Sequence, residues 1–333
     1  MLGILEHLNW DPVIFRINDA LALRWYGLMY VSAFIVGFFI FRWLQKTGYF
    51  RIKAEDISSY IVYGVFGVFL GGRLGYILFY QFDRIFMAVD SAGKATGEAF
   101  GDRMMSIVKV WEGGMSFHGG VFGVFFAMLL FSWRRKVSFF NLVDVSAHIV
   151  PLGVAFVRIG NFINGELYGR MITDESGKAI TDPDKLPWYA MKFPTDMAGY
   201  NPSAFNDPSA QGHLQRALRE QFVSNNPGVD VPTTLPQIPV DDTIWNNVEH
   251  FFPGRYPSQL VQFALEGMLV MALIWFIRRW FSRPGQMSAM FLILYAIFRI
   301  PAEMIRQPDT QIDPTKAGDL TGTAAFLQSM GLT

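Results

Sequence analysis

The feature that most constrains this chain is a set of apolar runs, each long enough to cross a lipid bilayer. A bilayer core about 30 Å thick needs roughly 20 apolar residues of helix to cross it. Runs of that length occur at residues 21–44, 57–80, 115–133, 139–163, 258–277 and 287–305. Buried helices of a large soluble protein would need more polar surface than this chain has, because 51% of its residues are hydrophobic and only 17% are charged. We therefore predict an all-α polytopic membrane protein with six transmembrane helices.

The balance of residue types excludes several classes of function. Lys plus Arg and Asp plus Glu are equal at 28 each, so no overall charge favours nucleic acid as a partner. The chain has no cysteine, which excludes disulfides, thiolate nucleophiles and cysteine-based metal sites of its own. Any thiol chemistry must therefore use a sulfur atom of the substrate.

The charges of the connecting segments predict the direction of the helices. Lys and Arg are retained on the cytoplasmic side of a membrane. Three alternate connections are basic, and they contain Arg42, Lys46, Arg51, Lys53, Arg134, Arg135, Lys136, Arg278, Arg279 and Arg283. We therefore expect a multi-pass protein of a bacterial inner membrane whose N-terminus lies in the periplasm.

The alternation of apolar and polar stretches divides the chain into four expected segments. Residues 1–165 would hold the first four transmembrane helices, and residues 257–309 the last two. Residues 166–256 are rich in Pro, Asp and Asn and too polar to span, so we expect them to form a periplasmic head or cap. Residues 310–333 would form a periplasmic tail.

Polar side chains from five predicted helices are expected at a common depth near the outer surface. A charged side chain at membrane depth costs about 2.5 kcal/mol or more, so one that persists usually faces a cavity. The helix directions place at this depth Tyr26, Arg73, His118, Arg158, Asn161, Glu166, Tyr295, Arg299, Glu303 and Arg306. A single arginine near a helix end is more simply explained by snorkelling to the headgroups, but convergence favours a site. Asp144, His148 and Glu266 lack such predicted neighbours, and we interpret them as structural partners.

These residue types suit the headgroup of a phospholipid. Arginine binds phosphate through a planar, permanently charged fork, so Arg158, Arg299 and Arg73 predict a phosphate site. His118 is the leading candidate for a general base, because imidazole titrates near neutral pH, although a lone histidine is more often structural.

Glycines are crowded beside these polar positions. They would let a lipid approach the backbone closely at Gly71, Gly72, Gly75, Gly113, Gly114, Gly119, Gly120, Gly165 and Gly169. Tight helix packing is the alternative role for a membrane glycine, and we assign it to Gly64, Gly67 and Gly123.

Five segments, in order along the chain, resemble motifs of the prolipoprotein diacylglyceryl transferase family. They are residues 24–30 (RWYGLMY), 71–76 (GGRLGY), 113–120 (GGMSFHGG), 158–170 (RIGNFINGELYGR) and 298–309, which contain Phe298-Arg299, Glu303 and Arg306-Gln307-Pro308-Asp309. The resemblance covers most of residues 11–309 apart from the external segment. It departs at Tyr256, where the family usually has a histidine before Pro-Ser-Gln-Leu, and at Val261-Gln262, where it usually has Tyr-Glu.

The resemblance implies a reaction of bacterial lipoprotein maturation. In its first step, the sn-1,2-diacylglyceryl group of phosphatidylglycerol moves to the lipobox cysteine thiol of a preprolipoprotein signal peptide. A thioether forms and sn-glycerol 1-phosphate is released. The partners would be these two substrates and the surrounding membrane lipids, and the site would face the periplasmic leaflet. Neither a metal nor an organic cofactor is expected.

The motifs and the depth argument together give the predicted site. The catalytic set is His118, Tyr26, Arg158, Asn161, Glu166 and Arg299, and the substrate-binding set is Arg158, Arg73, Gly119, Gly120, Gly169, Tyr295 and Glu303. An anionic-lipid transporter and a membrane-bound acyltransferase are the alternative functions, since both could use the same residue types. The family also has a seventh, C-terminal membrane helix. The sequence stops at Thr333, where that helix is expected to begin, so we expect it to be truncated or absent.

Overall fold

The computed structural model describes residues 13–16, 22–89, 94–95, 97–108, 114–193 and 252–307. Residues 194–251 of the expected head and the whole expected tail, residues 310–333, lie outside this part of the chain, as do Gly113, Pro308 and Asp309 of the motifs. The chain divides into two compact units. The first contains Met1–Tyr30, Val154–Leu269 and Tyr295–Thr333, and the second contains Val31–Gly153 and Val270–Leu294.

Long apolar helices dominate the described residues, which confirms the predicted polytopic all-α class. Five of these helices are long and apolar enough to cross a membrane, and a bent pair can supply a sixth span. The five are Trp25–Lys46 (α1), Asp56–Gln81 (α2 with η1), Phe117–Arg135 (α4), Ser258–Trp280 (α9 to η10) and Gln286–Ile305 (α11). Each overlaps a predicted run closely, because the length that a bilayer demands leaves a strong signal in the sequence.

The helix predicted over residues 139–163 is not continuous, because the structure divides it into two helices. α5 spans Phe139–Ser146 and α6 spans Val150–Ile163, and the two are bent by 42°. Pro151 accounts for the break. It has no backbone N–H to donate, and its ring clashes with the carbonyl four residues earlier, which belongs to Ala147.

The first predicted helix begins four residues too early. Residues 22–24 form strand β2 (Ala22–Arg24), which pairs antiparallel with β1 (Val13–Arg16), and α1 then begins at Trp25. β-branched and aromatic residues such as Val13, Ile14 and Phe15 favour this extended pairing, which overrides the apolar pattern.

Two of the spans contain π-helical segments, which the apolar pattern did not predict. α2 (Asp56–Tyr76) continues as η1 (Ile77–Gln81) and η2 (Asp83–Met87), and therefore extends past the predicted end at residue 80. The fifth span runs as α9 (Ser258–Gln262), the π segment η9 (Phe263–Leu269), α10 (Val270–Ile277) and η10 (Arg278–Trp280). π segments interrupt the regular turn of an α-helix and occur frequently at functional sites.

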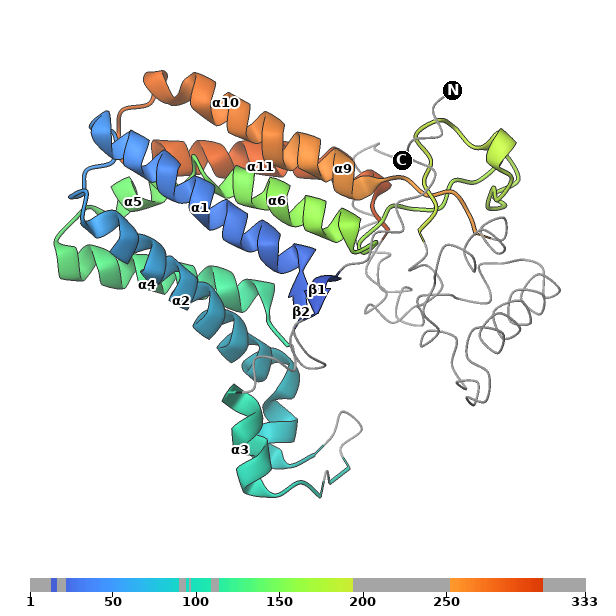
Figure 1. Ribbon diagram of the computed structural model, residues 1–333, viewed down its shortest axis with the longest axis horizontal. Helices are drawn as coiled ribbons and strands as arrows, with labels where there is room; N and C mark the ends of the chain where they lie inside the picture. The colour runs from blue at the N-terminus through green and yellow to red at the C-terminus, as the bar shows by residue number, and fades with distance from the viewer. Residues whose placement is uncertain are drawn as a thin grey trace, which may run out of the picture. The chain divides into compact units, whose positions relative to one another are not determined.

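In the second unit, α2 and α4 lie side by side along a row of glycines (Figure 1). A Cβ atom on Gly71 would lie 2.4 Å from the carbonyl oxygen of Gly119, and one on Gly123 would lie 2.0 Å from that of Gly67. The packing role of Gly67 and Gly123 is thus confirmed. Gly64 has nothing within 4 Å of a built Cβ, so its assignment to packing was wrong. Small residues let the two backbones approach closely where no hydrophobic force between helices operates.

The same unit contains the aromatic core and two buried polar residues. Phe50, Ile57, Phe131 and Leu142 are among the fully buried members of this core. α5 connects to the start of α11 through Asp144, whose carboxylate accepts hydrogen bonds from the backbone N–H groups of Gly285 (2.7 Å) and Ser288 (2.9 Å).

His148 has a similar structural position. Its Nδ1 donates to the carbonyl of Asp144 at 2.9 Å, and its ring packs against Tyr49 and Trp275. The structural roles that the sequence predicted for Asp144 and His148 are therefore confirmed.

Candidate active site

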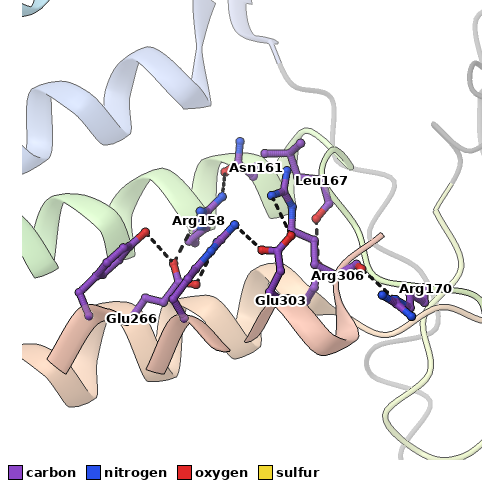
Figure 2. Close-up of polar contacts among 10 residues, drawn as sticks. Arg158, Asn161, Leu167, Arg170, Glu266, Glu303 and Arg306 are labelled. Atoms are coloured by element: carbon purple, nitrogen blue, oxygen red, sulfur yellow. Dashed lines mark hydrogen bonds and ion pairs between the residues drawn. The ribbon is translucent and has the colours of Figure 1, made fainter. Parts of the chain in front are cut away.

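A fully buried glutamate lies at the centre of the polar cluster in the first unit. The Glu266 side chain has 0% exposure, and Oε1 accepts a hydrogen bond from Arg299 Nη1 at 3.0 Å. Its other oxygen, Oε2, lies 3.6 Å from Arg158 Nη2 and accepts from the Tyr295 hydroxyl at 3.4 Å. Figure 2 shows the Arg158 and Glu266 side chains pointing toward one another from different helices. Glu266 thereby joins α6, η9 and α11.

Glu266 was predicted to lack charged neighbours, and that prediction was wrong, because Arg158 and Arg299 both contact its carboxylate. A detectable signal was present in the spacing. Gln259, Gln262 and Glu266 recur every three or four residues in an apolar span and are all buried, so they share one face of the helix. Both amide atoms of Gln262 are buried, with no hydrogen-bond partner among the described residues.

Arg158 begins a chain of polar contacts along the end of α6. Its Nη1 donates to Asn161 Oδ1 at 3.3 Å, and Asn161 Nδ2 donates to Glu166 Oε1 at 2.9 Å. Asn164 adds a second amide donor to the same oxygen at 3.3 Å. Three residues of the predicted catalytic set are therefore in direct contact, in the order Arg158, Asn161, Glu166.

The other half of the cluster lies along one face of α11. Tyr295, Arg299, Glu303 and Arg306 are spaced by four, four and three residues, which places them on neighbouring turns. The Glu303 carboxylate pairs with Arg299 Nη2 and lies 3.6 Å from Arg306 Nη1. Arg299 consequently uses one terminal nitrogen on Glu266 and the other on Glu303, which only the fork of an arginine can do.

Tyr26, at the start of α1, packs against α6. A Cβ atom on Gly160 would lie 2.9 Å from the Tyr26 ring, so glycine at that position makes room for the tyrosine. The Tyr26 and Tyr30 hydroxyls lie 3.4 Å apart. Tyr26 therefore contacts α6 at Gly160, two residues after Arg158 on the same helix.

The segment after α6 is held against α9, which fixes the position of Glu166. Gln259 Nε2 donates to the backbone carbonyl of Glu166 at 2.8 Å, and Ser258 Oγ donates to that of Leu167 at 2.9 Å. Gly169 has a packing role here, because a Cβ atom would lie 2.4 Å from the carbonyl oxygen of Tyr256. That role differs from the lipid contact that we predicted for Gly169.

The remaining predicted residues belong to the second unit. His118 is exposed on the first turn of α4, which Ser116 caps by accepting from the backbone N–H of Gly119 at 3.3 Å. Gly119 lies in the glycine row against α2, so helix packing accounts for it, whereas Gly120 has only one atom, at 3.8 Å, near a built Cβ. The convergence of His118 with the cluster in the first unit stays a prediction.

Arg73 has a different role from the phosphate contact that we predicted. Its guanidinium donates to the backbone carbonyls of Ile107 (2.9 Å), Gly114 (3.0 Å) and Ser106. The side chain is buried and joins α2 to the end of α3 (Phe100–Val108). Arg73 therefore holds neighbouring backbone in place and is not part of the site proposed below.

Paired charges dominate the chemistry of this cluster. Within the described ranges, no group of three His, Asp or Glu residues is arranged to hold a metal ion. Arg158 and Arg299 instead present guanidinium groups from two helices around one carboxylate. Such fixed donors can bind an anionic group and stabilise charge that develops on it.

Comparisons with known proteins show the family of this chain. The family model described as "Prolipoprotein diacylglyceryl transferase" matches residues 12–333. Similar proteins from Burkholderia thailandensis and Burkholderia mallei are each 38% identical over 334 aligned positions, which cover 98% of this chain and 90% of each relative. Both relatives carry the name "Phosphatidylglycerol--prolipoprotein diacylglyceryl transferase". Since the match spans nearly the whole sequence, this chain belongs to the prolipoprotein diacylglyceryl transferase family.

Proposed function

We propose that this multi-pass membrane enzyme transfers the sn-1,2-diacylglyceryl group of phosphatidylglycerol to the cysteine thiol of a prolipoprotein, the first step of lipoprotein maturation. The observation that carries the proposal is the Arg158–Glu266–Arg299 cluster in a chain of this family. The finer identity of the acceptor is a lipobox cysteine in a signal peptide, presented from the membrane.

The reaction is an alkyl transfer. The sulfur of the acceptor attacks the glyceryl carbon that carries the phosphate, a carbon–sulfur bond forms, and the carbon–oxygen bond to phosphate breaks. The products are the thioether and sn-glycerol 1-phosphate, and the thiol proton passes to a base. A free thiol has a pKa of about 8.5, so a base that raises its thiolate fraction accelerates the attack. His118 is the proposed base.

Arg158 and Arg299 are the proposed phosphate ligands. The phosphate gains negative charge as the carbon–oxygen bond breaks, so cations aimed at it stabilise the transition state more than the bound lipid. Asn161 and Glu166 position Arg158 through their hydrogen-bonded chain. Tyr26, Tyr295, Glu303 and Gly120 complete the proposed lining. Gly119 and Gly169 are retained for their packing, Gly119 against α2 and Gly169 against Tyr256.

The proposed topology follows from the basic connections. The N-terminus and residues 166–256 would lie in the periplasm of the inner membrane, with the site toward the periplasmic leaflet. Residues 1–165 and 257–309 are the proposed transmembrane segments and residues 310–333 the proposed periplasmic tail.

The test is incubation of the purified protein with phosphatidylglycerol and a lipobox peptide. We expect a diacylglyceryl thioether and an equal amount of sn-glycerol 1-phosphate. Mild base should remove the ester-linked acyl chains and leave the glyceryl thioether, whereas an acyl thioester would be lost entirely. Absence of both products, with lipid movement across vesicles, would replace the proposal with a transporter.

A further inference from the structure

The two carboxylates that contact Arg299 differ sharply in their surroundings. The Glu266 side chain is 0% exposed, whereas that of Glu303 is 47% exposed. Glu266 also contacts Arg158, which belongs to another helix, while Glu303 contacts Arg306, the residue that directly follows its own helix. One carboxylate is therefore built into the packing between helices, and the other lies at its edge.

We propose that Glu266 is a positioning residue, a fixed counter-ion that holds the guanidinium groups of Arg158 and Arg299 in place for the phosphate. Glu303, in contrast, is an exchangeable counter-ion that the lipid phosphate displaces from Arg299. This inference deepens the proposed function and rests on it, since it assigns the phosphate of the lipid to these two arginines.

The packing around Glu266 argues that it stays in place. The next residue, Gly267, lies so close to α6 that a Cβ atom there would be 2.7 Å from that of Ala155. The π segment therefore presses directly on the helix that carries Arg158. Because removing one partner of a buried ion pair leaves an uncompensated charge, Glu266 cannot withdraw from both arginines without a large cost.

One donor group of each arginine is assigned to the incoming anion. Arg158 uses Nη1 on Asn161 and Nη2 on Glu266, and its Nε is buried with no partner among the described residues. Arg299 Nη2 becomes available when Glu303 is displaced. A phosphate that replaces Glu303 exchanges one oxyanion for another, so Arg299 keeps a partner throughout binding.

A fixed negative charge behind the arginines also limits how tightly product is held. Two uncompensated guanidinium groups in a site of low dielectric would bind the released phosphate monoester strongly. Glu266 neutralises part of that charge while keeping the donors oriented, which favours product release. Its removal should therefore slow turnover and strengthen inhibition by product at the same time.

The test compares Glu266→Gln, Glu266→Asp and Glu303→Gln with the wild type. The measurements are kcat and KM for phosphatidylglycerol in mixed micelles, and the inhibition constant of added sn-glycerol 1-phosphate. For Glu266→Gln we expect kcat to fall by about 100-fold, the scale seen when one preorganised group is removed, and inhibition to begin at a lower concentration. Glu303→Gln should strengthen inhibition while keeping more of kcat than Glu266→Gln does.

Glu266→Asp keeps the test decisive if Glu266→Gln does not fold. It retains the negative charge but shortens the reach, so we expect a reduced kcat with an inhibition constant close to that of the wild type. A matched control is Glu98→Gln, which removes a carboxylate that pairs with Arg84 at 2.5 Å in the second unit. This variant should retain wild-type kinetics.

Three results would overturn the inference: a wild-type kcat in Glu266→Asp, a wild-type kcat in Glu266→Gln, or a loss of kcat in Glu266→Gln with unchanged product inhibition. The last would leave Glu266 with a purely architectural role. Failure of the proposed function is distinguishable, because the wild type itself would then form no thioether, whereas binding of sn-glycerol 1-phosphate can still be measured directly by calorimetry on the wild type and all four variants.

Discussion

Replacing Arg299 by methionine tests how much this arginine contributes to the stability of the protein, apart from its proposed role in catalysis. Met keeps much of the side-chain volume but leaves the fully buried Glu266 with one arginine, at 3.6 Å, in place of two. Removal of one member of a buried ion pair costs about 3–5 kcal/mol. We expect the lower end, about 3 kcal/mol, because Arg158 continues to compensate part of the charge.

A second substitution tests the origin of that loss. In the double variant Glu266→Gln with Arg299→Met, the buried negative charge is removed together with its partner. Contacting residues in one ion-pair network couple by about 0.5–3 kcal/mol, so the double variant should be more stable than the sum of its single changes allows. Thioether formation should be lost in Arg299→Met and also in the double variant, because the second change does not restore the phosphate ligand.

The assay is equilibrium unfolding in detergent micelles, with product analysis on the same samples. Arg84→Met is the matched control, since it breaks an arginine–glutamate pair whose side chains are 44% and 33% exposed. Such exposed pairs contribute about 0–1 kcal/mol. If Arg299→Met is no less stable than Arg84→Met, or if the two substitutions are simply additive, Glu266 is not held by Arg299 in the way that the geometry requires.

Three further predictions concern other parts of the chain. Gly71→Val should destabilise the α2–α4 pair by about 1–3 kcal/mol through overpacking, since a built Cβ lies 2.4 Å from a backbone oxygen of α4, while Gly64→Ala in open space should not lower the unfolding temperature. His118→Gln should reduce turnover by about 10²–10⁴-fold; wild-type turnover in this variant would exclude His118 as the base. Because the chain has no cysteine, single variants Arg134→Cys and Ser176→Cys can be labelled with an impermeant maleimide in intact spheroplasts. Only the cysteine at position 176 should react, and reaction of both would contradict the proposed topology.

The transmembrane helices could be predicted from the sequence because a bilayer sets their length and composition. All six runs correspond to helices or helix pairs in the structure. Local departures from helical geometry left weaker signals. Pro151 was visible, but a proline in a membrane helix is compatible with either a kink or a complete break, and neighbouring packing decides between them. The π segment Phe263–Leu269 has no residue pattern of its own.

The glycines show why a shared residue type did not give a shared role. Gly71 and Gly119 were predicted to admit a lipid, yet their backbones meet each other across the α2–α4 contact. Both roles require the absence of a side chain, so composition alone cannot separate them. Rotation of each helix about its axis decides which surface a glycine faces, and that rotation is set by tertiary packing.

The same limit explains why three basic positions were predicted more readily than their central acid. Arg158, Arg299 and Arg306 lie near helix ends, where the direction of the chain alone fixes their depth. Glu266 lies inside a span, and which side chains surround it depends on how each helix is rotated about its axis. Charge balance would have supplied the missing constraint. Partly buried arginines in a membrane protein require compensating charge, and the cluster has it, because Glu166, Glu266 and Glu303 supply as many carboxylates as there are arginines. When a membrane sequence predicts several arginines at one depth and a single acid inside a span, the acid is therefore best considered first as a partner of those arginines.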